Sequence, residues 1–305
     1  MSGVSHLVRK KIIKLLDNSR YVTLFAVILC CLPYATWLSM ALIGLVTLSK
    51  GARDGLMVLM PVSIVHASLL VSSMGIEWVC VNTMLNYLPV YIAACVLGSS
   101  IRWNTVYCSL FAQAWLCMLT LHVFMPEYII AQYDAVRRLI SQQDSLSVFF
   151  NDPMFKDPEG LNQVMFSNYV LGSQAVSIVC YAIFALILAR FVQSRLFYPG
   201  GFKQEMLSFC GNKWAVICGG LVALAAIKHQ VIAVNMLPLV ILYFLLVGLS
   251  LSAHALGTMR RTSVIFLFLL VPLGIFPLVL GPVYIVLGSL DSLFNFRTYF
   301  RRVPQ

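Results

Sequence analysis

The sequence predicts an all-α protein: a polytopic bundle of transmembrane helices that forms one integral-membrane domain over residues 1–305. Three observations carry this prediction. Hydrophobic residues make up 60% of the chain and charged residues only 10%, whereas soluble domains carry about 25% charged residues. The apolar residues gather into about eight runs, most of them near the roughly 20 residues that a helix needs to cross a bilayer. The basic residues lie mainly at the ends of these runs, which is typical of membrane orientation rather than of nucleic-acid binding.

The first and last apolar runs are longer than one bilayer crossing requires. Tyr21–Ser49 and Thr262–Leu290 each extend over 29 residues without a charge. A helix of that length would span about 43 Å, against a hydrocarbon core of about 30 Å. Pro33 interrupts the first run, and three prolines interrupt the last. Each run is therefore either one strongly tilted helix or two short helices, hinged at Pro33 in the first run.

The remaining runs are shorter and are separated by polar segments. They cover residues 55–73, 78–98, 105–124, 166–188, 214–227 and 231–256. The basic start, residues 1–20, is mildly amphipathic, which is typical of a helix on the inner membrane surface. Residues 125–165 hold six acids against three bases, and the apolar spacing in residues 129–140 predicts an amphipathic surface helix. The tail, residues 291–305, is aromatic and basic.

Residues 190–213 form a compact polar break between two apolar runs, and we interpret it as a hinge. Pro199, Gly200 and Gly201 form a turn signal, because proline fixes φ while glycine accepts a positive φ. We therefore expect both glycines in conformations that a Cβ atom disfavours. Four basic residues surround the turn, which predicts a cytoplasmic position.

The distribution of basic residues predicts the orientation of the chain. If both long runs re-enter or cross twice and the N-terminus is inside, the inner side collects seventeen Lys and Arg residues and the outer side four. If both long runs cross only once, twelve Lys and Arg residues lie inside and nine outside. Because cytoplasmic loops carry an excess of Lys and Arg, we expect both termini and the hinge in the cytoplasm and residues 125–165 outside. The expected location is a bacterial inner (plasma) membrane.

Polar residues within the apolar runs gather toward the outer side in this topology. The candidate substrate-binding residues are Asn82, Asn86, His122, Asn168, Gln174, His229 and Asn235. Asn82 and Asn86 are four residues apart and share one helix face. Polar groups in a bilayer usually face the bundle interior or a wet cavity. Two interpretations stay open: a polar pocket at the outer face, or side chains that bond neighbouring helices at about 0.6 kcal/mol each.

Sequence motifs for catalysis and for cofactors are missing from the chain. It contains no Walker A loop, HExxH, GxSxG or dinucleotide fingerprint, and no Cys/His spacing typical of a metal site. We therefore expect no enzyme activity, no cofactor and no metal. Acidic residues are missing from the apolar runs except for Glu77 at an edge, which argues against an autonomous proton-coupled pump.

Three motifs in the C-terminal half carry a resemblance to a known family. Residues 195–205, RLFYPGGFKQE, resemble an F-x-P-G-G-F-x-x-E hinge, and residues 288–297, GSLDSLFNFR, resemble a G-x-x-D-S-x-F-D-F-R ending. Residues 235–238 match N-x-L-P. These motifs are similar to those of the YybS-like bacterial membrane proteins, a family of unknown function. That family is distantly similar to substrate-binding subunits of energy-coupling-factor transporters and to the rod-shape protein MreD. Asn295 stands where the family carries aspartate.

The expected function is a membrane-embedded substrate-binding or transport component with an outer-face polar pocket. Its expected partners are the lipid bilayer and other membrane subunits, among them one that supplies energy. The alternative is a structural scaffold of an envelope or cell-shape complex. Small residues at four-residue spacing, such as Gly248 and Ser252, would permit close helix approach within the chain or against a partner.

Overall fold

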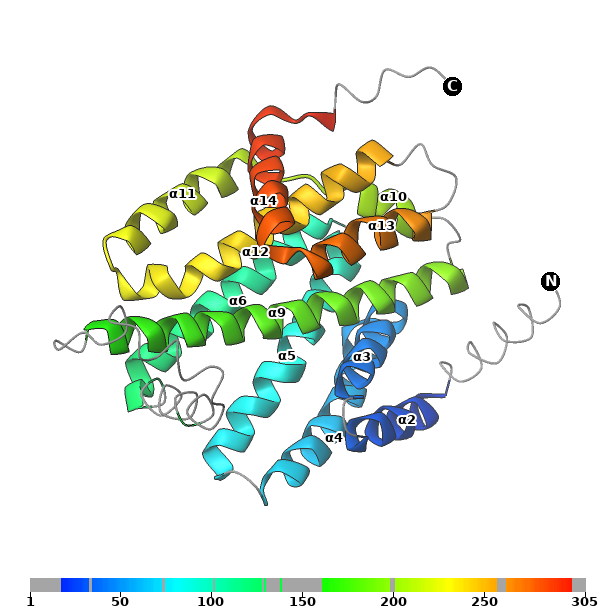
Figure 1. The fold of residues 1–305 in the computed structure, drawn as a ribbon. Coiled ribbons are helices and arrows are strands. Elements are labelled where there is room, and N and C mark those ends of the chain that lie inside the picture. The colour runs from blue at the N-terminus through cyan, green and yellow to red at the C-terminus, as the bar shows by residue number, and fades with distance from the viewer. Residues whose placement is uncertain are drawn as a thin grey trace, which may run out of the picture. The chain divides into compact units, whose positions relative to one another are not determined.

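The computed structural model describes residues 18–32, 35–72, 75–100, 102–127, 129, 138, 161–197, 201–256 and 262–297. Within these ranges the secondary structure is helical and no strand occurs, which confirms the predicted all-α class (Figure 1). The helices are α2 (Ser19–Cys31), α3 (Thr36–Lys50), α4 (Ala52–Leu70), α5 (Ile76–Ser100), α6 (Trp103–Phe124), α9 (Leu161–Phe197), α10 (Gly201–Ser208), α11 (Lys213–Ile227), α12 (Val231–Ala255), α13 (Thr262–Ile275) and α14 (Pro277–Phe294). The predictions for residues 1–17 and for most of 125–165 lie outside the described residues.

The chain forms two compact units. The first contains residues 1–110 and 178–206, and the second contains residues 111–177 and 207–305. Their boundaries fall inside α6 and α9, so each of these helices contributes to both units. The single domain expected from the sequence stays a prediction.

Both long apolar runs are broken into two helices. The first run forms α2, with 13 residues, and α3, with 15 residues, so each is about 20–23 Å long and short of a full hydrocarbon core. The last run forms α13 and α14, and α14 begins at Pro277. Proline has no backbone N–H, but the N–H groups of the first helical turn have no partner within the helix, so proline is tolerated there. Of the two interpretations of these runs, the pair of shorter helices is the one found. The break beside Pro33 itself lies outside the described residues.

The first unit is organised around α3, which packs against α2, α4 and α5. Its core contains fully buried aliphatic side chains from α3, α4, α5 and the C-terminal part of α9, among them Ile43, Val58, Val90, Leu97 and Leu186. A single residue, Gly51, joins α3 to α4 with a φ of 101°. L side chains rarely adopt that conformation, so this connection requires glycine.

A partly buried hydrogen-bond network holds α10 against α9 in the first unit. Arg190 donates to both carboxylate oxygens of Glu205, at 3.0 Å from Nε to Oε2 and 2.5 Å from Nη2 to Oε1. This paired geometry is the strongest that arginine makes with a carboxylate. Arg190 also donates to Gln193 Oε1 (2.6 Å), and Gln193 Nε2 donates to the Leu48 carbonyl at the end of α3 (2.8 Å). Trp103 Nε1 donates to Glu205 Oε2 at 3.4 Å. The glutamate of the hinge motif thus ties three helices together.

Of the turn signal in the hinge, the described part begins at Gly201, which is the first residue of α10. The expected backbone strain at the two hinge glycines stays a prediction. Pro199 and Gly200 lie outside the described residues.

The second unit is built on a close crossing of α12 and α14, which lie across one another in Figure 1. Gly248 on α12 lies against the backbone of Tyr284, and Gly288 on α14 lies against the backbone carbonyl of Phe244. A Cβ atom at either glycine would overlap these carbonyl oxygens. Backbones that approach this closely are typical of small-residue crossings between membrane helices.

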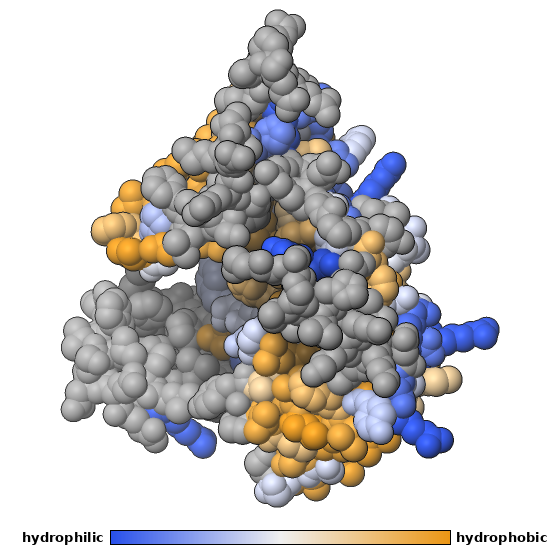
Figure 2. Space-filling view, turned by 90° about the vertical axis from the view of Figure 1, so that its right-hand side faces the viewer, coloured by the Kyte–Doolittle hydropathy of each residue, from blue (hydrophilic) through white to orange (hydrophobic). Residues whose placement is uncertain are grey.

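Six helical segments in the described part of the chain are long and apolar enough to cross a membrane. They are residues 52–70, 78–100, 103–124, 167–197, 231–255 and 277–294, and α2, α3 and α11 are shorter apolar helices. Large apolar side chains point outward from them: the exposed fraction is 64% for Met57 and 66% for Ile64. The coloured residues at the lower centre of Figure 2, at the height of α2–α4 in Figure 1, are accordingly mostly hydrophobic. Such a surface favours contact with lipid rather than with water.

Candidate functional site

The structure brings three of the seven predicted site residues into direct contact. His122 near the end of α6, Asn168 near the start of α9 and Asn235 in the first turns of α12 meet within the second unit. Asn168 and Asn235 are 2% and 0% exposed. Three helices thus place three polar side chains at one buried position.

Hydrogen bonds fix the orientation of the three side chains. His122 Nδ1 lies 2.8 Å from the carbonyl of Met118, one turn earlier on α6. A carbonyl only accepts, so Nδ1 carries the hydrogen and Nε2 of the neutral ring is an acceptor. Asn235 Nδ2 lies 3.3 Å from His122 Nε2 and donates to Asn168 Oδ1 at 3.0 Å. Asn235 therefore supplies the donor that both of its neighbours share.

One buried acceptor of the cluster has no donor. His122 Nε2 lies 3.1 Å from Asn168 Oδ1 and would donate to it if it carries a hydrogen. Asn235 Oδ1 is buried and has no hydrogen-bond partner among the described residues. A buried acceptor without a donor costs about 1–3 kcal/mol. The arrangement would accordingly be stabilised by a group that brings N–H or O–H donors.

The local sequence of α12 explains why Asn235 lies at this point. Pro238 has no N–H, so the carbonyl of Val234, four residues earlier, loses its usual helical donor. Gly172 of α9 lies against the backbone carbonyl of Asn235 and the ring of Pro238, where a Cβ atom would stand 2.7 Å and 3.2 Å away. The small glycine lets α9 and α12 approach closely, and this approach brings Asn168 and Asn235 together.

Asn82 and Asn86 form a separate pair on α5 in the first unit. Asn86 Nδ2 donates to Asn82 Oδ1 at 2.7 Å and to the Asn82 carbonyl at 2.9 Å. The pair therefore satisfies part of its hydrogen bonding along its own helix. The predicted shared face is present, and both side chains are half-buried. Whether this pair and the His122 cluster serve one pocket stays a prediction.

The other two predicted residues are Gln174 and His229, and their place in a binding site stays a prediction. Gln174 is half-buried on α9. His229 is exposed in the turn between α11 and α12 and has a φ of 61°. Histidine is among the residues that tolerate this left-handed conformation, which gives His229 a local role in the turn.

A second polar contact, which the sequence did not single out as a site, lies in the first unit. His66 Nδ1 on α4 lies 3.0 Å from Thr83 Oγ1 on α5, and the His66 ring packs edge-on against Tyr87 at 5.2 Å between centroids. The Tyr87 hydroxyl donates to Cys30 Sγ on α2 at 3.3 Å. These contacts join three helices. Threonine and tyrosine are both common in apolar helices, so the spacing of residues in the sequence did not predict that Thr83 and Tyr87 would form these contacts.

The described residues contain no group of three or more His, Cys, Asp or Glu side chains that could hold a metal ion. No family model matches the chain, and neither a curated protein nor a solved structure matches it. The class of the protein follows from its helices alone. It is a multi-pass α-helical membrane protein.

Proposed function

We propose that the protein is a substrate-binding or transport component of a bacterial inner membrane, with His122, Asn168 and Asn235 in its binding site. The observation that supports this most is the fully buried Asn235 Oδ1, which has no partner among the described residues. An intramembrane polar cluster that serves packing alone would be expected to close its own hydrogen bonds. Energy would come from a partner subunit, since the apolar runs hold no carboxylate for proton coupling.

The chemistry of the cluster indicates the class of substrate. One acceptor of the cluster, the buried Asn235 Oδ1, has no donor among the described residues. A small polar solute with an ammonium, amide N–H or hydroxyl group would supply that donor, whereas an anion such as a carboxylate or phosphate would add more acceptors. We therefore propose a donor-bearing, uncharged or cationic substrate and no catalytic step.

Asn235→Leu tests the binding site directly, because leucine is close to asparagine in size and lacks its amide. The protein is purified in mild detergent from its native membranes, and bound small molecules are identified by mass spectrometry. We expect a donor-bearing solute with the unchanged protein. Asn235→Leu should lower its occupancy at limiting solute by roughly 5- to 150-fold, corresponding to about 1–3 kcal/mol for a ligand left unpaired.

Asn86→Leu is the matched control for this experiment. Asn86 bonds within its own helix, so the same exchange should change stability by at most roughly 1.7 kcal/mol and leave the solute bound. Equal loss of solute and of folded protein in both variants would contradict the proposed site.

A structural scaffold is the second candidate, and one observation favours it. Asn82 and Asn86 bond each other, and His66 bonds Thr83 of the neighbouring helix, as expected when polar groups only join helices. Phenotypes that follow protein abundance across all asparagine variants would support the scaffold. The resemblance to YybS-like proteins stays a prediction and is compatible with both functions.

We also propose that both termini and the 190–213 hinge lie in the cytoplasm and that residues 125–165 lie outside. The separate helices α2, α3, α13 and α14 are compatible with a run that turns back to the side on which it began, by re-entering or by crossing twice, which is the arrangement with seventeen basic residues inside. Alkaline phosphatase fused after Gln143 is expected to be active, and the same enzyme fused after Gly201 inactive. Activity at both positions, or at neither, would show that the orientation is wrong.

A further inference from the structure

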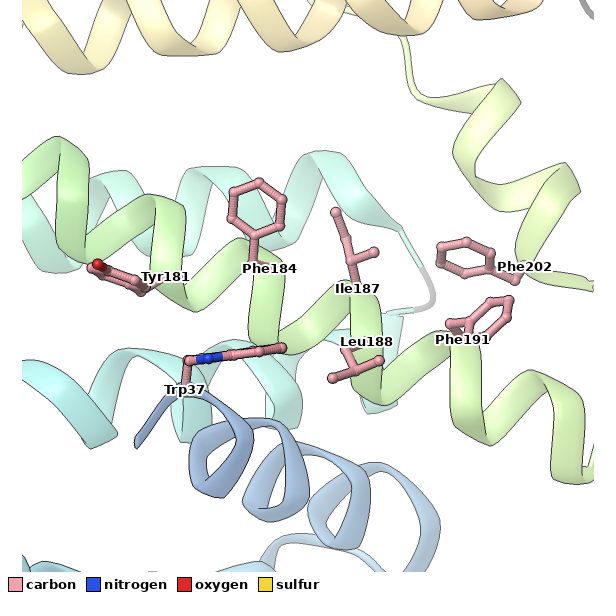
Figure 3. A pocket seen from close by; sticks show the side chains of 7 residues that line it. All are labelled: Trp37, Tyr181, Phe184, Ile187, Leu188, Phe191 and Phe202. Atoms are coloured by element: carbon pink, nitrogen blue, oxygen red, sulfur yellow. The ribbon is translucent and has the colours of Figure 1, made fainter. Parts of the chain in front are cut away.

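An open groove about 540 Å³ in volume runs along α9 in the first unit. It is lined by seven aromatic or aliphatic side chains: Trp37 from α3, Tyr181, Phe184, Ile187, Leu188 and Phe191 from α9, and Phe202 from α10. Figure 3 shows them in a row, with Tyr181 at one end and the facing rings of Phe191 and Phe202 at the other. Tyr181 and Phe184 are 55% and 60% exposed, so the groove is open on one side. Its volume lies within the range of about 300–1,000 Å³ typical of small-molecule pockets.

The length of the groove matches one leaflet of a bilayer. Tyr181 and Phe191 are ten residues apart on a continuous helix, which corresponds to about 15 Å. Half of a hydrocarbon core of about 30 Å is also about 15 Å. Both residues lie inside the apolar segment 167–197 that is long enough to cross the membrane. The groove therefore lies at the depth of lipid acyl chains.

A positive charge lies at one end of the groove. The Arg195 guanidinium is 5.2 Å from the centre of the Phe191 ring, in a cation–π arrangement. Arg195 is exposed in the last turn of α9, about 6 Å beyond Phe191 along the axis. Arg190 is neutralised by Glu205, whereas Arg195 forms no ion pair with any described carboxylate. Among the described side chains at this end, Arg195 thus carries the charge available to a ligand.

We propose that this groove binds an anionic phospholipid, with an acyl chain against the aromatic row and the phosphate beside Arg195. Along α9, apolar side chains extend over the depth of one leaflet and are followed by a cation at headgroup level. The apolar side chains match the acyl chain of such a lipid, and the cation matches its phosphate. A transmembrane helix of a partner fits less well. Spread over about 15 Å, 540 Å³ gives a cross-section of roughly 36 Å², against roughly 80–110 Å² for a helix 10–12 Å across.

Trp37 provides a probe inside the groove. The full-length protein is reconstituted in phosphatidylcholine vesicles that contain a small fraction of phosphatidylglycerol with brominated acyl chains, which quench nearby tryptophans. The signal of Trp37 is the difference between the unchanged protein and Trp37→Phe. We expect brominated phosphatidylglycerol to quench Trp37 at about one fifth of the mole fraction that brominated phosphatidylcholine requires, since one arginine near an anionic headgroup contributes about 1 kcal/mol.

Variants of two exposed arginines make the test specific. Arg195→Gln should abolish the fivefold preference for phosphatidylglycerol, and Arg195→Lys should retain most of it. Arg53→Gln removes the same charge from an exposed position at the start of α4, outside the groove, and should leave the preference unchanged. Equal quenching by the two lipids in the unchanged protein, or equal effects of Arg195→Gln and Arg53→Gln, would overturn the proposal. So would protection of Trp37 from both lipids together with cross-linking of Phe184→Cys to a second copy, because a protein helix would then fill the groove.

Discussion

Gly288→Ala is expected to destabilise the protein, whereas Gly281→Ala on the same helix is not. The new Cβ at position 288 would overlap the backbone carbonyl of Phe244 on α12, and a backbone atom cannot rotate away as a side chain can. The two helices must then separate, and such overpacking costs about 1–3 kcal/mol or more. The Cβ at position 281 meets no atom within 4 Å, so that exchange should keep the helix-propensity gain of about 1 kcal/mol that alanine has over glycine.

The comparison is made by thermal or denaturant unfolding of the purified variants in one detergent. Both exchanges add one methyl group to α14, so a difference between them reports the α12–α14 crossing alone. Gly248→Ala should resemble Gly288→Ala, because its Cβ would overlap the Tyr284 carbonyl at the same crossing. The double variant should cost less than the sum of the two, since the first exchange already separates the helices. Equal stability of Gly281→Ala and Gly288→Ala would show that α12 and α14 are farther apart at their crossing than they are in the structure.

The helical class and the ends of most helices could be predicted because they depend on local properties of the chain. The lengths of the apolar runs set the spans, and the prolines in the first and last runs indicated that each could break. They did not indicate where, since Pro272 and Pro282 lie inside α13 and α14. The choice between one tilted helix and two shorter ones depended on packing, which run length does not report.

The partners within the candidate site could not be predicted. His122 and Asn168 are 46 residues apart, and Asn168 and Asn235 are 67 apart, so only the crossing of three helices shows that they meet. Their polarity within apolar runs identified these residues as unusual, but it did not indicate which of them contact one another. For Asn82 and Asn86 the four-residue spacing indicated a shared face, but the same spacing lets the two amides bond each other, as they do on α5. The unpaired Asn235 Oδ1 is a property of the assembled cluster and has no counterpart in the sequence.

Asp291 and Arg297 form a buried ion pair at the end of α14 that explains part of the GSLDSLFNFR motif. Arg297 Nε donates to Asp291 Oδ2 at 3.1 Å, and the side chains are 9% and 0% exposed. Asn295 lies between them as the C-cap of α14 with a φ of 49°. Asparagine accepts this left-handed conformation more readily than most residues, and the turn that it makes brings Arg297 back to Asp291. A negative charge at position 295 is therefore not needed for the turn.

Removing one member of this pair is expected to destabilise the protein more than either glycine exchange at the α12–α14 crossing. Arg297→Gln leaves the Asp291 carboxylate buried without its cation, which costs about 3–5 kcal/mol. Arg297 Nη2 also donates to Ser250 Oγ at 3.2 Å, and Ser250 donates to the Phe209 carbonyl at 2.8 Å, so the loss should loosen the attachment of α14 to α12. The measurement is unfolding of the purified variant in detergent, with Arg102→Gln at an exposed position as the matched control, expected within about 0.5 kcal/mol of the unchanged protein.

The double variant Asp291→Asn/Arg297→Gln separates the cost of an unpaired charge from the contribution of the pair itself. Two neutral amides can still bond each other across the turn and carry no charge into the interior, so the double variant should recover a large part of the stability that Arg297→Gln loses. If the double variant is instead as unstable as the sum of the two single variants, the two side chains act independently, and the ion pair does not hold the end of α14 in place. A recovery with Arg102→Gln unaffected would show that α14 ends where it does because a buried aspartate there requires the arginine six residues later.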